Sequence, residues 1–462
     1  MIYRNIERHA SRFKDYTELR IHENRSLGIQ ILNGDVLSNN RESGAGVSAR
    51  VYRGGVWGFA SAPFLDDAAI GRVIETATQN AQFLSSREKR GMGPLPMAKA
   101  SAAHDLSSPK PRGNQEKYLG FARALDAYLK EKHPELLSRS IYLGTLEVEK
   151  HLLTSEGSVS TLLVPRTVLY LSASREAKNA SKDRVEQGHV FGGGGHFEEH
   201  FGDPAALFPG IEAVCEDLAR KAEGDHAEAG EHEVVLGPDL AGILAHEAIG
   251  HTVEADLVLG GSVAGDFLGK PVATELVSIT DFAHTALGAP CPQPLWVDDE
   301  GTPARDTVLI ENGVLKNFMH NKETARHFGH EATGHARAWS FSDEPLIRMR
   351  NTAILPGKSR LADMIASIDK GYYLEQPSNG QADSTSEFMF GVTRGREIRG
   401  GKLGRALFDA TVSGVAFDML KTVTMVSDDM RWESGGMCGK KQPIPVGMGG
   451  PALKCRIRIG GR

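Results

Sequence analysis

The segment 246–251 of this chain, HEAIGH, places two imidazoles and a carboxylate within six residues. Neutral imidazole is a good zinc ligand, and a neighbouring carboxylate can take a proton from water that the metal activates. The residue types and their order therefore indicate metal-dependent hydrolysis. The common zinc-peptidase helix carries its histidines four residues apart and on one face, whereas His246 and His251 are five residues apart.

This five-residue spacing is a geometric problem for a straight α-helix. At 3.6 residues per turn, five residues rotate by about 140°, which aims the two rings apart. Gly250, just before His251, can permit a local distortion that brings the rings together. Pro238 can open a helix, and the apolar residues between 240 and 244 recur at helical spacing. We therefore expect a buried helix that presents the histidines at its end.

A second copy of the pattern, HEATGH, occupies residues 330–335. It lies between Gly329 and Gly334, in a stretch with no apolar stripe, and this favours a loop. Loops position ligands less rigidly than helices do. We therefore predict that His330, Glu331 and His335 are bystanders for metal binding.

Two histidines do not complete a catalytic zinc site, which usually has three protein ligands and an open position. The candidates for the third ligand are Glu254, Asp256, Asp281 and Cys438. For Glu254 and Asp256 we favour a solvated helix end. Cys438 is flanked by glycines, which let the backbone bring a sulfur close to a partner, and a metal would deprotonate the thiol.

Other catalytic motifs have weaker support in the sequence. The glycine runs at 192–195 and 400–401 have neither the Lys-Ser/Thr ending of a phosphate loop nor the strand-to-helix context of a dinucleotide fold. We interpret both runs as flexible turns. The G-x-S-x-G nucleophile elbow does not occur in the chain.

The composition is that of a globular protein with two or three domains: 462 residues, 40% hydrophobic and 24% charged. The net charge of −6 argues against nucleic acid as the main partner. No apolar run approaches the roughly 18 residues of a membrane span, and the charged first 25 residues lack the apolar core of a signal peptide. Four scattered cysteines make a disulfide framework improbable. We expect a cytoplasmic protein without a membrane or nucleic-acid partner.

The sequence of the first half of the chain predicts β-hairpins and helices. Residues 17–62 predict strands, with turns at 33–35 and 54–55. Helical spacing predicts helices over 66–84, 115–132 and 207–222, and strands are expected between 140 and 173. Residues 91–112 are rich in Pro, Ser, Ala and Lys and are interpreted as a linker.

From residue 234 onward, short extended runs separated by glycines follow the histidine helix. We therefore expect an α+β fold in which a two-part N-terminal α/β region precedes a mostly β C-terminal domain that carries the metal-binding helix. The predicted boundaries are 1–105 and 106–228 for the two N-terminal α/β subdomains, and 229–462 for the catalytic domain.

Taken together, these segments resemble the TldD/PmbA family of metalloproteases, and within it the catalytic TldD branch. The resemblance is carried by VVLGPD at 234–239, HEAIGH followed by EAD at 254–256, and GGMCGK at 435–440 followed by PVG at 445–447. In the first half it is carried by GAGV at 44–47, WGFAS at 57–61 and TSEG at 154–157. One departure is the second motif at 330–335, where the family usually has a polar, glycine-containing loop.

The resemblance implies a zinc peptidase that acts on unfolded or extended peptides. His246, His251 and Cys438 would be the zinc ligands, and Glu247 would be the general base that acts on metal-activated water. It also implies a dimer, either a homodimer or a heterodimer with a PmbA-type paralogue. The PmbA branch of the family lacks the histidine motif and serves as a non-catalytic partner. A non-catalytic dimer partner or regulator of this type is the alternative function for this chain. A metal hydrolase with a substrate other than a peptide is a second alternative.

Overall fold

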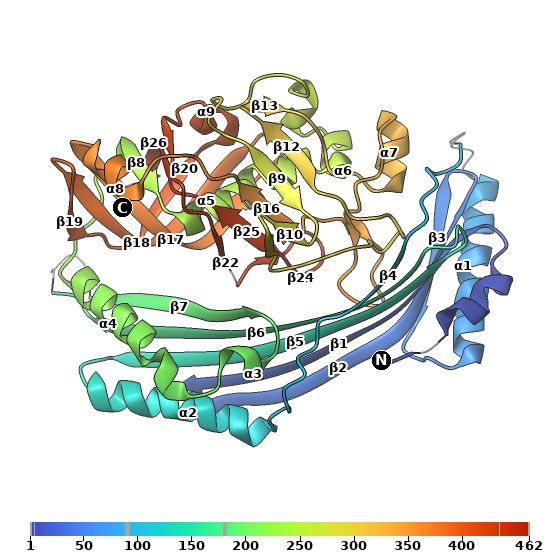
Figure 1. Ribbon diagram of the computed structural model, residues 1–462, viewed down its shortest axis with the longest axis horizontal. Helices are drawn as coiled ribbons and strands as arrows, with labels where there is room; N and C mark the ends of the chain where they lie inside the picture. Colours follow the sequence, from blue (N-terminus) through green and yellow to red (C-terminus); the bar gives the residue numbers. More distant parts are fainter. Residues whose placement is uncertain (1, 4, 88–92, 179–182, 434, 461–462) are drawn as a thin grey trace.

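The structure, a computed structural model, describes residues 2–3, 5–87, 93–178, 183–433 and 435–460. A long curved sheet from the first half of the chain holds the second half on its concave side (Figure 1). Helices cover the opposite, convex side of the sheet. The expected succession of an N-terminal α/β region and a mostly β C-terminal part is confirmed.

The N-terminal sheet has seven strands in the order β3-β2-β1-β5-β6-β4, and β7 also pairs with β6. The strands are β1 (Tyr16–Leu32), β2 (Asp35–Arg53), β3 (Val56–Ala62), β4 (Ser101–Asp105), β5 (Ser138–Thr154), β6 (Val159–Glu176) and β7 (Arg184–Gly194). Both predicted hairpin turns are confirmed, since Asn33 and Gly34 in one, and Gly54 and Gly55 in the other, have positive φ.

Two interpretations of this region are wrong. Residues 101–105 of the supposed linker form β4, which pairs in parallel with β6; residues 91–92 lie outside the described residues. The supposed turn at 192–195 is largely strand, because Gly192 to Gly194 pair with β6 at the end of β7. At Gly192 the backbones of β6 and β7 lie too close together for a side chain, because a Cβ there would be 2.3 Å from the Thr167 carbonyl oxygen.

Helices α1 (Asp67–Arg87), α2 (Gln115–Lys132) and α4 (Phe208–Ala222) confirm the three predicted helices. Short helices lie at η1 (Ile6–Arg12), α3 (Phe197–His200) and η2 (Pro204–Leu207). The apolar stripe of α1, from Ile70 to Ala81, packs against one end of the sheet, and α2 and α4 share a core with the other end. Since β1–β3 and β5–β7 belong to one sheet, the boundary at 105 crosses it. The division into 1–105, 106–228 and 229–462 stays a prediction.

The C-terminal part contains a closed barrel. Strands β17 (Lys370–Ala382), β8 (Gly230–Leu236), β26 (Leu453–Gly460), β20 (Ala410–Val415) and β18 (Glu387–Arg399) pair in this order. Pairing of β17 with β18 closes the ring. Strands β19 (Lys402–Ala406) and β21 (Met425–Val426) extend it. The histidine helix follows β8 directly, so the barrel fixes where that helix begins.

A second sheet lies beside the barrel, in the order β13-β12-β9-β16-β25-β22. Its strands are β9 (Ile279–Phe282), β12 (Thr307–Glu311), β13 (Val314–Leu315), β16 (Asn351–Ile354), β22 (Arg431–Glu433) and β25 (Gly447–Gly450). Three two-stranded pairs complete the part: β10 (Thr285–Ala286) with β11 (Ala289–Pro290), β14 (Ala336–Arg337) with β15 (Leu346–Ile347), and β23 (Met437–Cys438) with β24 (Ile444–Pro445). Its helices are α5 (Pro238–Leu244), η3 (Ala245–Gly250), η4 (His251–Val253), α6 (Ala255–Leu259), η5 (Val263–Asp266), α7 (Lys322–Phe328), α8 (Leu361–Ala366) and α9 (Ala416–Leu420).

Buried ion pairs join the N-terminal sheet to the C-terminal part. Arg50 on β2 pairs with Glu300, and Lys150 on β5 lies 2.6 Å from a carboxylate oxygen of Asp299. Each of these charges has a partner, as buried charges require. The sheet is therefore docked against the C-terminal part by specific contacts. None of the helices in the described ranges is long and apolar enough to span a membrane.

Candidate metal centre

The histidine helix contains the distortion that its spacing predicts. Helix α5 continues into a π-helical turn over Ala245–Gly250 and then a 3-10 turn over His251–Val253. The backbone N–H of His251 donates to the carbonyl of His246, which is the i to i+5 hydrogen bond of a π-helix. The two ring centroids lie 5.0 Å apart. A five-residue spacing thus brings both imidazoles to one side of the helix.

Glycine is needed at position 250 for a reason other than the expected backbone distortion. Its backbone has φ −55° and ψ −51°, which any residue can adopt. A Cβ at this position would lie 1.9 Å from the sulfur of Met349. Glycine is therefore needed for close packing against the segment leading into β16, and not for backbone freedom.

Of the four candidates for a third ligand, Cys438 is the one that meets the two histidines. One donor atom from each of His246, His251 and Cys438 lies within 4.8 Å of the other two. The sulfur is 3.4 Å from Nε2 of His251. Cys438 reaches this position from the β23–β24 pair, in which it lies opposite Ile444.

The chemistry of these three side chains fits a zinc ion. His246 is fully buried, and neither of its ring nitrogens has a hydrogen-bond partner among the residues that the structure describes. Such an orphaned group is costly unless something else binds it. Burial alone raises the pKa of the Cys438 thiol, but the neighbouring imidazoles of His246 and His251 lower it to about 4. Two imidazoles and a thiolate are characteristic zinc donors.

Glu254 supports His251 from behind. Its Oε2 lies 2.8 Å from Nδ1 of His251, and its side chain is fully buried. Burial opposes the charge on the ring, but the Glu254 carboxylate and the Cys438 sulfur together outweigh it and raise the pKa of His251 to about 10. The interpretation of Glu254 as part of a solvated helix end is therefore wrong. Its place three residues after His251 was the available signal, because residues three apart share a helix face.

Lys440 completes the charge balance around Glu254. Its Nζ lies 3.0 Å from Glu254 and 2.8 Å from Asp256. Asp256 is half-buried and paired, and it has no contact with the histidines among the described hydrogen bonds and ion pairs. Sequence reasoning did not identify Lys440 as part of the centre, although it closes the glycine-rich segment that carries Cys438.

Glu247 lies beside His251, one of the three donors. Its Oε2 is 3.7 Å from Nε2 of His251, the ring nitrogen that also faces Cys438. The side chain of Glu247 is 18% exposed. A carboxylate in this position lies close to a donor atom of His251 and retains access to solvent.

The fourth candidate ligand, Asp281, belongs to a buried network around the second motif. His335 is fully buried, and its Nε2 lies 3.0 Å from Oδ1 of Asp281. Arg350 Nε donates to the same oxygen at 2.8 Å, and the hydroxyl of Thr352 donates to the other oxygen. The role of His335 that these contacts indicate is structural.

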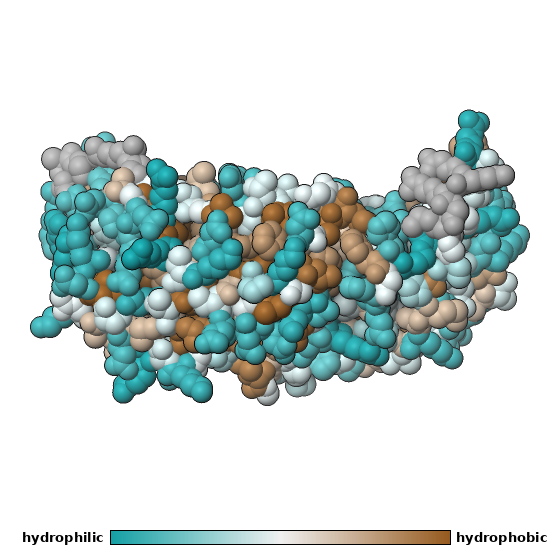
Figure 2. Space-filling model, turned by 90° about the horizontal axis from the view of Figure 1, so that it is seen from above, coloured by the Kyte–Doolittle hydropathy of each residue, from teal (hydrophilic) through white to brown (hydrophobic). Residues whose placement is uncertain are grey.

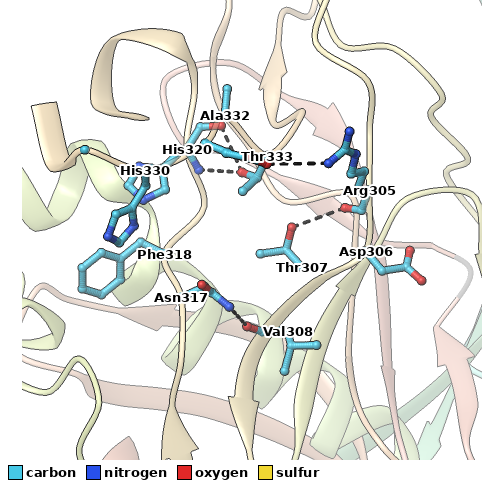
Figure 3. Close-up of a pocket in the computed structure, with 12 residues that line it drawn as sticks. Arg305, Asp306, Thr307, Val308, Asn317, Phe318, His320, His330, Ala332 and Thr333 are labelled. Atoms are coloured by element: carbon cyan, nitrogen blue, oxygen red, sulfur yellow. Dashed lines mark hydrogen bonds and ion pairs between the residues drawn. The ribbon is translucent and has the colours of Figure 1, made fainter. Parts of the chain in front are cut away.

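The remainder of the second motif is a surface loop, as predicted. His330 is exposed and lines an open pocket of about 600 Å³. Figure 3 shows His330 and Phe318 on one side of this pocket and Arg305 and Asp306 on the other. Among the described residues, the second motif supplies no member of a cluster of three metal-binding side chains.

The comparisons with known proteins agree with this architecture. Residues 229–461 match the PmbA/TldA metallopeptidase C-terminal domain, and residues 17–81 match the PmbA/TldA metallopeptidase domain 1. A metalloprotease TldD homologue of Buchnera aphidicola from Acyrthosiphon pisum is 32% identical, over 99% of this chain and 95% of its own length. A zinc metalloprotease TldD homologue of Saccharolobus solfataricus is 35% identical over 53% of this chain and 55% of its own length.

Two solved structures share the fold. TldE from Thermococcus kodakarensis has a TM-score of 0.76 and 19% identity, with 98% of each chain covered. A candidate modulator of a DNA gyrase from Thermotoga maritima has a TM-score of 0.77 and 18% identity, with 96% of each chain covered. Together with the family match over residues 229–461 and the full-length relatives, these findings place the chain in the PmbA/TldD family of metallopeptidases.

Proposed function

We propose that this chain is a zinc-dependent peptidase that hydrolyses unfolded or extended peptides, with His246, His251 and Cys438 as zinc ligands and Glu247 as general base. The observation that carries the proposal is the meeting of the three donor atoms within 4.8 Å of one another. The fully buried His246, whose ring nitrogens have no partner among the described residues, supports a ligand role. Zinc also appears in the name of the Saccharolobus solfataricus relative.

Zinc, when bound, supplies a Lewis acid that polarises the peptide carbonyl and activates a water molecule. Glu247 accepts the proton of the attacking water and then returns it to the nitrogen of the leaving amine. Glu254 holds the proton of His251 on Nδ1, 2.8 Å away, and so directs Nε2 towards Cys438. The chain's own residues thereby supply orientation and proton transfer.

Limited exposure of the centre supports an extended substrate. The side chain of His251 is 16% exposed and Cys438 is 2% exposed, so only a thin segment of chain can reach the donors. A folded protein would have to unfold locally to provide such a segment. We therefore expect selectivity for conformation.

The edge of the second sheet suggests how a peptide binds. Strand β22 is the last strand of this sheet and pairs only with β25 among the strands described. Two residues after its end, the chain enters the segment that carries Cys438. A peptide that adds to β22 would form main-chain hydrogen bonds and pass beside the metal centre. Because such bonds are independent of side chains, we expect broad sequence recognition.

The dimer implied by the family remains part of the proposal, either as a homodimer or as a heterodimer with a PmbA-type paralogue. Apolar side chains gather in the middle of the face that the C-terminal part turns away from the N-terminal sheet (Figure 2). Such gatherings are typical of surfaces that another chain covers. The cytoplasm stays the predicted location.

The test combines metal analysis with a peptide-library digest. We expect one zinc per chain, cleavage of library peptides, and loss of cleavage after chelation that zinc restores. One substrate protein is then compared in native and denatured form, at a site buried in the native form. Equal rates for both forms would refute the requirement for an extended chain. Absence of any cleavage by the zinc-loaded protein would favour the non-catalytic partner instead.

A further inference from the structure

Residues 435–445 form a short hairpin, here called the cysteine hairpin. Its own backbone pairing is too small to fix its conformation. Its two strands, β23 and β24, have only two residues each, which pair Met437 with Pro445 and Cys438 with Ile444. Isolated two-stranded hairpins are at best marginally stable in water, even when they are longer. Contacts from outside the hairpin must therefore determine where the sulfur lies.

The C-terminal part holds the hairpin from one side. Arg348 is fully buried, and its guanidinium donates to the carbonyl of Cys438 at 2.8 Å and to that of Gln442 at 2.7 Å. Arg337 donates to the carbonyl of Pro445 at 3.0 Å. These contacts fix the second half of the hairpin and the peptide that follows the ligand.

The N-terminal sheet holds the hairpin from the other side. Arg166 lies on β6 and is 7% exposed. Its Nη1 donates to the carbonyl of Gly436 at 3.2 Å and lies 3.5 Å from the sulfur of Met437. Gly436 has no side chain of its own, and a Cβ there would lie 2.6 Å from the Val446 carbonyl oxygen. Arg166 therefore contacts the two residues immediately before the ligand.

Small displacements of the Cys438 sulfur would change the geometry of the proposed metal site. Zinc–sulfur bonds are about 2.3 Å long, and workable metal sites keep their distances within about 0.2 Å of the ideal values. A shift of Gly436 and Met437 moves Cys438 relative to His246 and His251, which the π-helical turn fixes independently. The contact with Arg166 thus links the docking of the sheet to the geometry of the three donors.

We propose that Arg166 is a positioning residue of the metal centre: it holds Gly436 and Met437 so that Cys438 stays within reach of His246 and His251. The inference rests on the zinc site in the proposed function. Metal affinity then depends on the N-terminal sheet of the same chain, although all three ligands come from the C-terminal part.

The test uses the full chain with zinc or cobalt added to the metal-free protein. Cobalt bound to a thiolate gives a charge-transfer absorption band, which reports the bond to Cys438 directly. Zinc affinity is measured by competition with a chromogenic chelator, without any activity assay. For Arg166→Met we expect zinc affinity to fall about 10- to 100-fold, as for other residues that orient ligands, and the band to weaken at saturating cobalt.

Arg20→Met is the matched control. Arg20 is also a buried arginine of the N-terminal sheet, 3% exposed, and it donates to the carbonyls of Ser340 and Asp343 in the C-terminal part. None of its described contacts is with the cysteine hairpin. We expect Arg20→Met to lower the unfolding temperature of the metal-free protein but to keep the cobalt band at full strength. A general stabilising role of Arg166 would give the same pattern as this control.

If Arg166→Met is unstable, Arg166→Gln provides the second variant. The glutamine side chain is polar but too short to reach the carbonyl of Gly436. Wild-type zinc affinity and a full cobalt band in either folded variant would overturn the inference while leaving the zinc site intact. If the wild-type protein itself shows no thiolate band and Cys438→Ser changes nothing, the proposed ligand set fails together with this inference.

Discussion

Oε2 of Glu254 lies 2.8 Å from Nδ1 of His251, and the same carboxylate is 3.0 Å from Nζ of Lys440. The imidazole is thereby held between a buried charge on one nitrogen and the sulfur of Cys438 on the other. Carboxylate, histidine and metal in this order form a recurrent arrangement in zinc sites, because the carboxylate fixes the ring orientation. It gives Glu254 a role that can be tested separately from the ligands.

We expect Glu254→Gln to lower zinc affinity by about 10- to 100-fold while the fold is retained. The amide preserves the shape of the side chain but removes the charge that stabilises His251 and Lys440. Chelator competition measures the effect. Asp256→Asn is the control, because Asp256 also contacts Lys440 but not His251, and its affinity should stay near that of the wild type. Equal losses in both variants would contradict the specific role of Glu254.

Replacement of the proposed general base should separate catalysis from binding. We expect Glu247→Gln to reduce peptide hydrolysis by about 10²-fold or more, because the amide cannot accept a proton from water. The zinc content and the thermal unfolding curve should match those of the wild type. Steady-state cleavage of a fluorogenic peptide gives the rate. Near-normal turnover by this variant would assign the base to another residue.

Replacement of the thiol should weaken the metal site. We expect Cys438→Ser to lower zinc affinity by more than about tenfold, since a hydroxyl is a poor zinc ligand compared with a thiolate. Metal analysis after dialysis against a chelator measures the loss. Cys455→Ser is the matched control, because Cys455 is equally buried but lies on β26 of the barrel. Loss of zinc from the control alone would refute the assignment.

The packing at Gly250 predicts an interaction between two substitutions. We expect Gly250→Ala to destabilise the protein by about 1 to 3 kcal/mol, because its Cβ would overlap the sulfur of Met349. Met349→Ala removes that sulfur, so the double variant should be more stable than the sum of the two single effects. Urea denaturation of all four proteins measures the coupling. Strict additivity would mean that Gly250 serves another purpose.

The second motif should affect stability but not zinc. We expect His335→Ala to cost about 3 kcal/mol, because Asp281 loses a buried hydrogen bond to its charged oxygen. His330→Ala should change stability by less than about 0.5 kcal/mol, since this side chain is exposed. Both variants should retain one zinc per chain by metal analysis. A second stoichiometric metal that disappears in His330→Ala would contradict this assignment.

The features that the sequence predicted best were those with local causes. The apolar spacing before His246 predicts a helix, and the five-residue step predicts that this helix is distorted. A π-helical turn meets both requirements, and Gly250 within it packs against Met349, which lies about a hundred residues later in the chain. The spacing of residues within the helix cannot predict that contact.

The errors came from contacts between distant segments. From the sequence, Glu254 is interpreted as solvated although His251 is near in the sequence, because its second partner, Lys440, lies far away along the chain. Strand β4 is hidden in a segment with the composition of a linker, and only the free edge of β6 gives it a partner. Arg166 escaped notice for the same reason, since Gly436 meets it only after the two halves of the chain have docked.

The closed barrel has a consequence for the order in which the protein assembles. Strand β8, which leads into the histidine helix, pairs with β26, and most of the C-terminal part lies between them in the sequence. Contacts between such distant segments form late, because a long loop must close first. A growing chain therefore carries both histidines well before it has the sulfur of Cys438 or strand β26, without which the barrel is incomplete. The three donors of the proposed zinc site are thus complete only in the last stage of synthesis.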